Sequence, residues 1–307
     1  MLTRRLGAKL FLVCAMPTQI SPLRPDRLVL AGAAVLFLLN LSVDASSAPQ
    51  SSRLLSKMKN IELCNGSDRS SPEPQIRGCT ALINSENETT LIRSVAHNNR
   101  GGAYVAQGNF DAAINDYNQA INLNPDFARP FNNRGFAYLK KGNYEQALKD
   151  FDQAIKLKSD YGRAFANRAE VHQMRHDYQS AVRDYDSAIR VQPELVAGWN
   201  GRCWTRAIMG ELQPALADCN KALAIQPTDA ATLDSRGLIH LKLGQLDSAI
   251  NDYSSALRIE PALATALYGR GLARIKKGDA TGGKADLAAA AKLEKKIAEN
   301  FSHYGIQ

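Results

Sequence analysis

The stretch Asn98-Asn99-Arg100-Gly101 decides the fold, because it returns unchanged 34 residues later as Asn132-Asn133-Arg134-Gly135. A fixed period of about 20 to 50 residues is typical of proteins built from stacked repeats. The sequence therefore predicts a repeat array over residues 94–297. Weaker copies continue the register, so the six predicted units are 94–127, 128–161, 162–195, 196–229, 230–263 and 264–297.

Two runs with helical apolar spacing lie inside every unit. A turn residue separates the two runs, and a proline ends most units because proline cannot continue a helix. The turn residues are Gly108, Gly142, His176, Gly210, Gly244 and Gly278, and the prolines are Pro125, Pro193, Pro227 and Pro261. Each unit is therefore predicted to be an antiparallel helical hairpin, which makes the fold class all-α.

Small side chains recur at three positions of the units, where they let neighbouring helices approach closely. Position 8 holds Gly101, Gly135, Ala169, Cys203, Gly237 and Gly271. Position 20 holds Ala113, Ala147, Ala181, Ala215, Ala249 and Gly283, and position 27 holds Ala120, Ala154, Ala188, Ala222, Ala256 and Ala290. This pattern resembles the tetratricopeptide repeat. The resemblance covers about 200 of the 307 residues and implies a right-handed superhelical solenoid of helix hairpins.

The two ends of the array depart from the repeat pattern. Residues 46–93 are expected to hold a linker and a degenerate capping hairpin. At the other end, Lys295 stands where most units have proline. The last helix is therefore expected to run on through Ile297 toward Phe301 as a cap that faces water, within a terminal cap and tail at residues 298–307.

Two charged columns match each other in number, one basic and one acidic. Position 7 holds Arg100, Arg134, Arg168, Arg202, Arg236 and Arg270, and position 23 holds Asp116, Asp150, Asp184, Asp218, Asp252 and Asp286. A charge at a position that is commonly apolar in this family needs a partner on a facing helix, in the same or the preceding hairpin. We expect structural ion pairs, and the acidic column argues against a basic ladder for phosphates.

Four cysteines follow the leader segment: Cys64, Cys79, Cys203 and Cys219. An even number of cysteines in an exported chain favours two disulfides. The repeat register places Cys203 and Cys219 on the two helices of one hairpin, leaning toward each other. Cys64 and Cys79 would staple the capping hairpin in the same way. Buried free thiols stay the alternative for both pairs.

The first 45 residues have the pattern of a secretory signal peptide. An apolar run over residues 28–43 follows Arg24 and Arg27, and small residues surround a cleavage point after Ala45. Met16 would give a leader of ordinary length, so residues 1–15 are treated as a mis-annotated start. The pattern predicts export, with the periplasm of a Gram-negative bacterium as the compartment. An uncleaved inner-membrane anchor at residues 28–43 is the alternative.

The family resemblance also indicates where a ligand would bind. In this family the inner face of the superhelix is lined largely by positions 2, 5, 9, 12 and 13 of the first helices. Asparagine can hydrogen-bond a peptide backbone, and exposed aromatic residues supply anchors. The alternative that Phe136 and Trp204 pack between repeats stays open. The candidate residues carried over are Asn98, Arg129, Asn132, Phe136, Arg163, Asn200, Trp204 and Leu238.

No motif for catalysis, a cofactor or a metal ion stands out in the sequence. His172 and His176 have a spacing that can hold a metal, but they occupy a repeat position and a turn position, so we interpret both as structural. The net charge of +8, from 38 basic and 30 acidic residues, is too mild to indicate nucleic acid. The sequence predicts a non-enzymatic, exported scaffold that binds a polypeptide in a concave groove. A membrane-tethered envelope assembly or biogenesis factor that self-associates through its end repeats is the runner-up.

Overall fold

The computed structural model describes residues 48–67 and 71–305, which form helices and no strand. The predicted leader at residues 28–43 lies outside the described residues. Among the helices that are described, none combines the length and apolar character that a membrane span needs. The helices are α1 (Ala48–Cys64), α2 (Pro72–Ile83), α3 (Thr90–Ala106), α4 (Phe110–Leu123), α5 (Ala128–Lys140), α6 (Tyr144–Leu157), α7 (Gly162–Met174), α8 (Tyr178–Val191), α9 (Val196–Ile208), α10 (Leu212–Ile225), α11 (Ala230–Lys242), α12 (Leu246–Ile259), α13 (Ala264–Lys277), α14 (Ala280–Leu293) and α15 (Ile297–His303).

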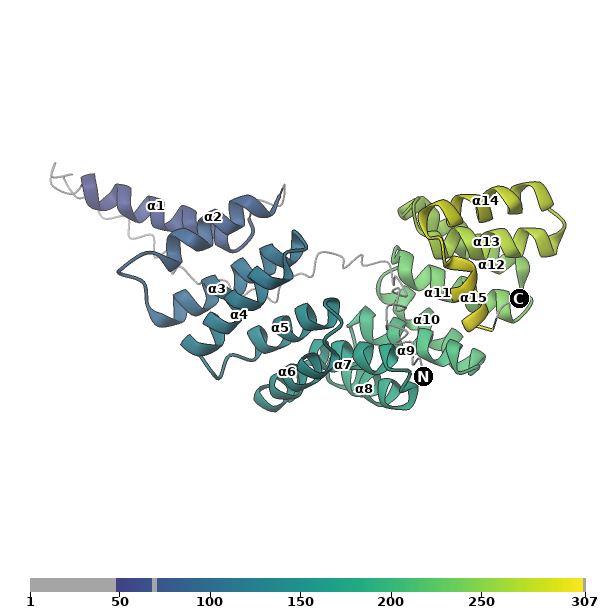
Figure 1. Cartoon of the computed structure of the whole chain (residues 1–307), viewed down its shortest axis with the longest axis horizontal. Coiled ribbons are helices and arrows are strands. Elements are labelled where there is room, and N and C mark those ends of the chain that lie inside the picture. The colour runs from purple at the N-terminus through teal and green to yellow at the C-terminus, as the bar shows by residue number, and fades with distance from the viewer. Residues whose placement is uncertain (1–47, 68–70, 306–307) are drawn as a thin grey trace, which may run out of the picture. The chain divides into compact units, whose positions relative to one another are not determined.

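The described chain forms two compact units, which divide within α9. We call residues 48–198 the N-terminal unit and residues 199–305 the C-terminal unit. In each unit, consecutive helices pack as antiparallel pairs and each pair packs on the next (Figure 1). The predicted all-α solenoid of helix hairpins is thus confirmed.

Glycine at position 8 lets the two helices of a hairpin meet through an aromatic ring. A Cβ atom on Gly135 would lie 2.8 Å from the ring of Phe151, and one on Gly237 would lie 2.8 Å from the ring of Tyr253. Contacts this short do not occur in real proteins, so a larger residue would force the helices apart. Glycine at this position therefore sets the helix spacing in these two hairpins.

The turns inside the hairpins explain the recurring glycines and the polar residues that follow them. Gly108 and Gly142 have φ of +74° and +75°, and His176 adopts φ of +59° at the equivalent place. This left-handed conformation favours glycine, and His176 is the one non-glycine residue in the described part of the chain that adopts it. The side chains of Asn143 and Asp177 then cap the next helix by accepting from the backbone N–H three residues on.

Helices α1 and α2 form the hairpin that precedes the repeats, and α2 packs on α3. Cys64 and Cys79 are joined across this hairpin, with their Cα atoms 4.5 Å apart. A second bond joins Cys203 to Cys219 across α9 and α10, with a Cα separation of 5.4 Å. Both pairs are fully buried. The structure thus brings together the cysteine pairs that the repeat register suggests.

The end of the array differs from the expectation of one long, water-facing last helix. Helix α14 stops at Leu293, and Glu294 takes the extended conformation (φ −140°, ψ 105°) that Glu260 takes one repeat earlier. The chain then turns into α15, which buries Ile297 and Phe301. The expectation was wrong because burying these two apolar side chains outweighs continuing the helix into water.

Candidate polypeptide-binding surface

Every arginine at position 7 forms a two-pronged ion pair with the aspartate at position 23 of its own hairpin. In the pair of Arg134 with Asp150, Nε donates to Oδ2 at 2.8 Å and Nη2 donates to Oδ1 at 2.7 Å. The other five pairs have the same geometry, with distances between 2.6 and 2.9 Å. The carboxylates are almost fully buried, whereas the guanidinium groups are partly exposed. This fork-to-fork geometry is the strongest form of side-chain pairing.

The same arginines also hold the preceding hairpin. Arg134 Nη1 donates to Asn118 Oδ1 at 2.6 Å, and Arg236 Nη1 donates to Asn220 Oδ1 at 2.8 Å. Arg100 makes the equivalent bond to Thr80 Oγ1 at 2.9 Å. Each of these acceptors is on the second helix of the hairpin before. The arginine column therefore joins successive hairpins, and it is not a surface for phosphates.

Burial affects the pKa values of two of these carboxylates, those of Asp150 and Asp116. Burial raises the pKa of Asp150 above its ordinary value, and the hydrogen bonds from Arg134 counteract only part of that shift. Burial acts in the same direction on Asp116, but hydrogen bonds from Arg100 and His97 outweigh it and lower the pKa of this group. His97 Nδ1 lies 2.8 Å from Asp116 Oδ1. The aspartate of the hairpin formed by α3 and α4 therefore has an additional partner.

A ladder of asparagine side chains crosses the N-terminal unit. Asn133 Nδ2 donates to Asn98 Oδ1 at 3.0 Å, and Asn167 Nδ2 donates to Asn132 Oδ1 at 2.9 Å. Within each Asn-Asn pair the first amide donates to the second, at 3.1 and 3.2 Å. Asn99 Nδ2 extends the ladder to the carbonyl oxygen of Cys64. We call this set the asparagine ladder; its members are Asn98, Asn99, Asn132, Asn133 and Asn167.

The ladder corrects two of the predicted binding residues. Asn98 and Asn132 are only 3% and 5% exposed, and their amides bond to neighbouring ladder members. They lie between adjacent first helices instead of facing an open groove. The sequence signal that they carry is therefore structural, because a buried amide must find its partners inside the protein.

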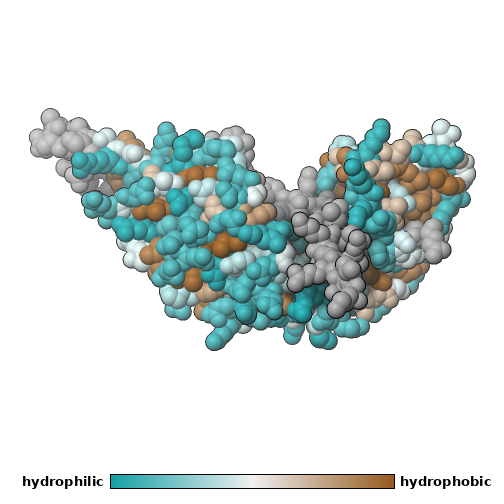
Figure 2. Space-filling view, in the orientation of Figure 1, coloured by the Kyte–Doolittle hydropathy of each residue, from teal (hydrophilic) through white to brown (hydrophobic). Residues whose placement is uncertain are grey.

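The accessible residues of this face lie further along α5 and α7. Phe136 is half-buried, and Lys140 Nζ lies 4.8 Å from the centre of its ring. Lys140 also donates to Glu170 Oε1 on the next first helix at 3.0 Å. Arg129 and Arg163 lie seven residues before Phe136 and Glu170, so helical spacing places them on the same sides of α5 and α7. We call these five residues the inner-face set. Polar residues cover most of the visible surface of this unit (Figure 2).

Phe136 takes part in both roles that the sequence left open. Its ring packs against the core cluster that contains Leu139 and Phe151, yet part of it stays accessible beside Lys140. A partly exposed aromatic ring with a cation over its face is a common anchor for a binding partner.

The C-terminal unit carries the other three candidates, and α15 changes their role. Leu238 is 1% exposed, so the prediction that it lines an open groove is wrong. Trp204 is half-buried and meets the ring of Tyr304 at 5.0 Å in an edge-to-face contact. Asn200 has a buried Oδ1 with no hydrogen-bond partner. The sequence missed this arrangement because no repeat position predicts where Phe301 and Tyr304 fold.

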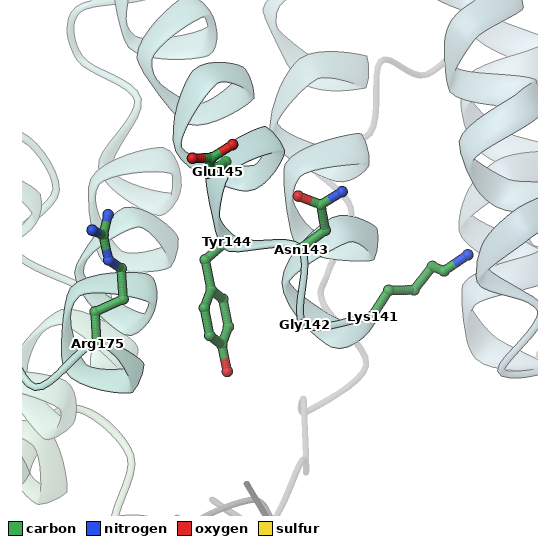
Figure 3. Close-up of a pocket in the computed structure, with 6 residues that line it drawn as sticks. All are labelled: Lys141, Gly142, Asn143, Tyr144, Glu145 and Arg175. Atoms are coloured by element: carbon green, nitrogen blue, oxygen red, sulfur yellow. The ribbon is translucent and has the colours of Figure 1, made fainter. Parts of the chain in front are cut away.

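A shallow hollow lies at the turn between α5 and α6, beside the end of α7. Figure 3 shows that its side chains point in different directions and do not converge on one centre. Such an arrangement offers a ligand no set of aligned donors and acceptors. The lining residues are Lys141, Gly142, Asn143, Tyr144, Glu145 and Arg175.

The two histidines with metal-binding spacing have separate surroundings. His172 lies 3.7 Å from oxygens of both Asp177 and Asp184. His176 Nδ1 lies 2.9 Å from the hydroxyl of Tyr178. Within residues 48–67 and 71–305, no group of three or more His, Cys, Asp and Glu side chains is arranged to hold a metal ion.

Comparison with known families identifies the repeats. The family described as TPR repeat matches residues 101–142 and 237–278, and the family described as tetratricopeptide repeat matches residues 128–161. The chain is a tetratricopeptide repeat protein. Proteins of this class are generally scaffolds for protein–protein interactions. Comparison with curated protein sequences gives no match.

Solved structures share the fold at low sequence identity. The Cut9–Hcn1 hetero-tetramer of the APC/C has a TM-score of 0.69 at 15% identity, over 79% of this chain and 47% of that one. This chain thus spans about half the length of that protein. A tetratricopeptide repeat protein from Parabacteroides merdae gives 0.61 at 18% identity, over 81% and 99%. PilW, a type IV pilus biogenesis factor, gives 0.56 at 19% identity, over 68% and 94%. At these identities the likeness is one of fold alone.

Proposed function

We propose that this chain is a non-catalytic scaffold that binds a polypeptide on the concave inner face formed by its first helices. The observation that carries the proposal is the inner-face set, in which Phe136 offers an accessible aromatic surface next to Lys140. The set has three cations, Arg129, Lys140 and Arg163, against one acid, Glu170. This excess of positive charge favours a segment that has acidic side chains next to an apolar anchor.

Capture of the partner tests this proposal. A photo-crosslinking amino acid at position 129, in the native compartment, should trap a polypeptide that mass spectrometry identifies. Lys140→Ala with Phe136→Ala should reduce the yield about tenfold or more, since aromatic anchors carry much of the energy of an interface. Lys156→Ala is the matched control, because Lys156 is exposed on α6. An unchanged yield from a double variant that keeps its helical circular dichroism would contradict the proposal.

Export to the periplasm is part of the same proposal. It is supported by the leader pattern of residues 1–45 and by the pairing of Cys64 with Cys79 and of Cys203 with Cys219. Disulfides persist in oxidising compartments such as the periplasm. N-terminal sequencing of the mature chain should begin near Ser46. An intact apolar run in the membrane fraction would instead support the inner-membrane anchor.

A second candidate is a membrane-tethered envelope assembly or biogenesis factor that self-associates through its end repeats. It is favoured by α1, which leaves Leu54, Leu55 and Met58 exposed. Apolar side chains gathered on one end hairpin are a typical contact surface between copies. Leu55→Asp with Met58→Asp should abolish a dimer in light scattering if this candidate holds. A chain that is monomeric before the change would exclude it.

A further inference from the structure

Helix α15 has one apolar face. Ile297, Phe301 and Tyr304 are spaced i, i+4 and i+7 and are only 1%, 3% and 8% exposed. Glu299 and Ser302, on the other side, are exposed. An amphipathic helix with anchors at this spacing is the form in which many proteins bind a helical partner in a groove.

The apolar face of α15 lies on the first helices of the C-terminal unit. The ring of Tyr304 meets Trp204 of α9 at 5.0 Å, and the ring of Phe301 meets Tyr268 of α13 at 4.7 Å. Leu238 of α11 belongs to the same buried cluster. In Figure 1, α15 leaves the end of α14 and turns back toward α11.

Three residues of this cluster stand at a repeat position that belongs to the inner-face set in the N-terminal unit. Trp204, Leu238 and Leu272 occupy position 9, which Phe136 occupies in α5. Tyr268 occupies position 5, where the N-terminal unit has Asn98 and Asn132 of the asparagine ladder. Helix α15 therefore occupies, within its own chain, a surface that corresponds to the one where we expect a partner in the other unit.

Two polar atoms of the first helices near this surface lack a hydrogen-bond partner. Asn200 and Asp234 each lie one helical turn before a covered residue, Trp204 or Leu238. Asn200 Oδ1 and Asp234 Oδ1 are buried and have no hydrogen-bond donor, although Asp234 Oδ2 accepts from Thr265 Oγ1 at 2.7 Å. A buried acceptor without a donor is costly. The first helices of this unit are therefore less fully hydrogen-bonded to one another than those joined by the asparagine ladder.

Helix α15 has features of a segment that can detach locally while the rest of the chain stays folded. It has seven residues, and no side chain caps its first turn. A helix this short is unstable alone and depends on its docked face. Its short connection to α14 nevertheless gives it an effective concentration on the order of millimolar, so a partner must compete with it.

We propose that the face formed by Trp204, Leu238, Tyr268 and Leu272 is a receptor for an amphipathic helix, which α15 occupies in cis until a partner displaces it. The partner is a helical segment with aliphatic and aromatic residues at i, i+4 and i+7, as in Ile297, Phe301 and Tyr304 of α15. This inference rests on the proposed function as a binding scaffold and names the ligand class of the C-terminal unit.

A labelled peptide with the sequence of residues 294–305 tests the receptor in the full-length chain. Phe301→Ser with Tyr304→Ser should release α15, and the peptide should then bind about tenfold or more tighter than to the unchanged chain. Adding Trp204→Ala should remove that binding. Ile275→Ser with Leu293→Ser is the matched control, because both residues are exposed in the same unit; this variant should bind no better than the unchanged chain.

Failure of the released variant to bind the peptide, while it keeps its helical content and cooperative melting, would overturn the proposal. A second measurement does not depend on that variant folding. Hydrogen exchange in the unchanged chain should be about tenfold or more faster in α15 than in α13, because α15 opens locally. Equal exchange rates would show that α15 is permanent core and would also overturn the proposal.

Self-association is the competing explanation, and light scattering on the same samples distinguishes it. If α15 is exchanged between two copies, the unchanged chain is a dimer that the released variant converts to a monomer, and the cis assignment fails. The crosslinking experiment at residue 129 reports on the other unit. A failure there, together with peptide binding here, would reject the inner-face set and keep this receptor.

Discussion

The first helices of the two units solve the same packing problem with different chemistry. In α3, α5 and α7 the contacts between successive helices include the asparagine ladder, and every step of it has a donor and an acceptor. In α11 the residue equivalent to Asn133 is Ser235, whose hydroxyl donates to Ala231 of its own helix. Asn200 Oδ1 and Asp234 Oδ1, at the position of Asn98 and Asn132, have no hydrogen-bond partner. The same repeat thus supports two kinds of face. In one unit the polar side chains hydrogen-bond to one another, and in the other an apolar face lies under α15.

The ion pairs that join the helices, which we call the frame, stay the same in the two units, whereas the exposed and buried faces of the first helices differ. The arginine–aspartate pairs are the same in both units, with donor–acceptor distances within 0.1 Å for Arg134 with Asp150 and Arg236 with Asp252. These pairs join helices at positions that the inner face does not use. Residues at positions 5, 6 and 9 therefore differ between the two units while these ion pairs stay the same.

The largest expected effect tests whether the arginine–aspartate pairs stabilise both units equally. Asp150→Ala leaves Arg134 partly buried without its counter-charge and should cost about 3 to 5 kcal/mol of unfolding free energy. Asp252→Ala should cost a similar amount in the other unit. Urea unfolding followed by circular dichroism measures both, with the exposed Asp160→Ala as control. Costs below about 1 kcal/mol, typical of surface pairs, would contradict the assignment.

The next largest effect is a pH dependence of the unfolding free energy, which we expect from Asp234 in the C-terminal unit. Burial raises the pKa of Asp234 to about 7, with Glu260 adding to the shift, although the hydrogen bond from Thr265 opposes it. The folded state therefore holds a proton that the unfolded state releases near pH 4, so this group makes stability fall as pH rises from about 4 to about 7, by up to about 4 kcal/mol.

Asp234→Asn isolates that contribution, because an amide does not titrate in this range. The urea midpoint of the unchanged chain should fall between pH 5 and pH 8 relative to that of the variant. Parallel pH profiles for the two proteins would show that Asp234 is ionised in the folded state, and that its surroundings are more polar than its burial indicates.

The disulfide of the first hairpin should have a somewhat smaller effect. Cys64→Ser with Cys79→Ser removes a link that closes a loop of about 15 residues, worth about 3 kcal/mol. Hydrogen exchange should show the loss mainly in α1 and α2, because among the described helices this hairpin packs only on α3. A loss spread evenly to α8 would mean that the hairpin is part of one cooperative unit.

The smallest effect concerns the ladder itself. Asn133→Ala removes the bond to Asn98 and leaves buried amide groups without partners, at a cost of about 1 to 2 kcal/mol. Ser235→Ala at the equivalent position should cost less, because its hydroxyl bonds only within its own helix. Equal costs in thermal unfolding would remove the distinction between the two faces.

The sequence was a good guide wherever a residue's role repeats with the period. The 34-residue register predicted the hairpins, the close approach at Gly135 and the pairing of the arginine and aspartate columns, because each depends on contacts that recur from unit to unit. It assigned Asn98 and Asn132 to an open face for the same reason. A residue type that recurs at one repeat position indicates that the position matters. It does not indicate whether the side chain faces solvent or the next helix.

The linear order of the residues determined the all-α class, the number of hairpins and the cysteines able to pair, since these follow from local helix geometry and from spacing along the chain. Only the tertiary structure decided that α14 ends at Leu293 and that α15 folds onto Trp204 and Tyr268. The contact of Trp204 with Tyr304 joins residues about 100 positions apart and occurs once, so the repeat period does not predict it. Its cause is the burial of apolar surface, which depends on which faces lie within reach in space and not on their order in the sequence.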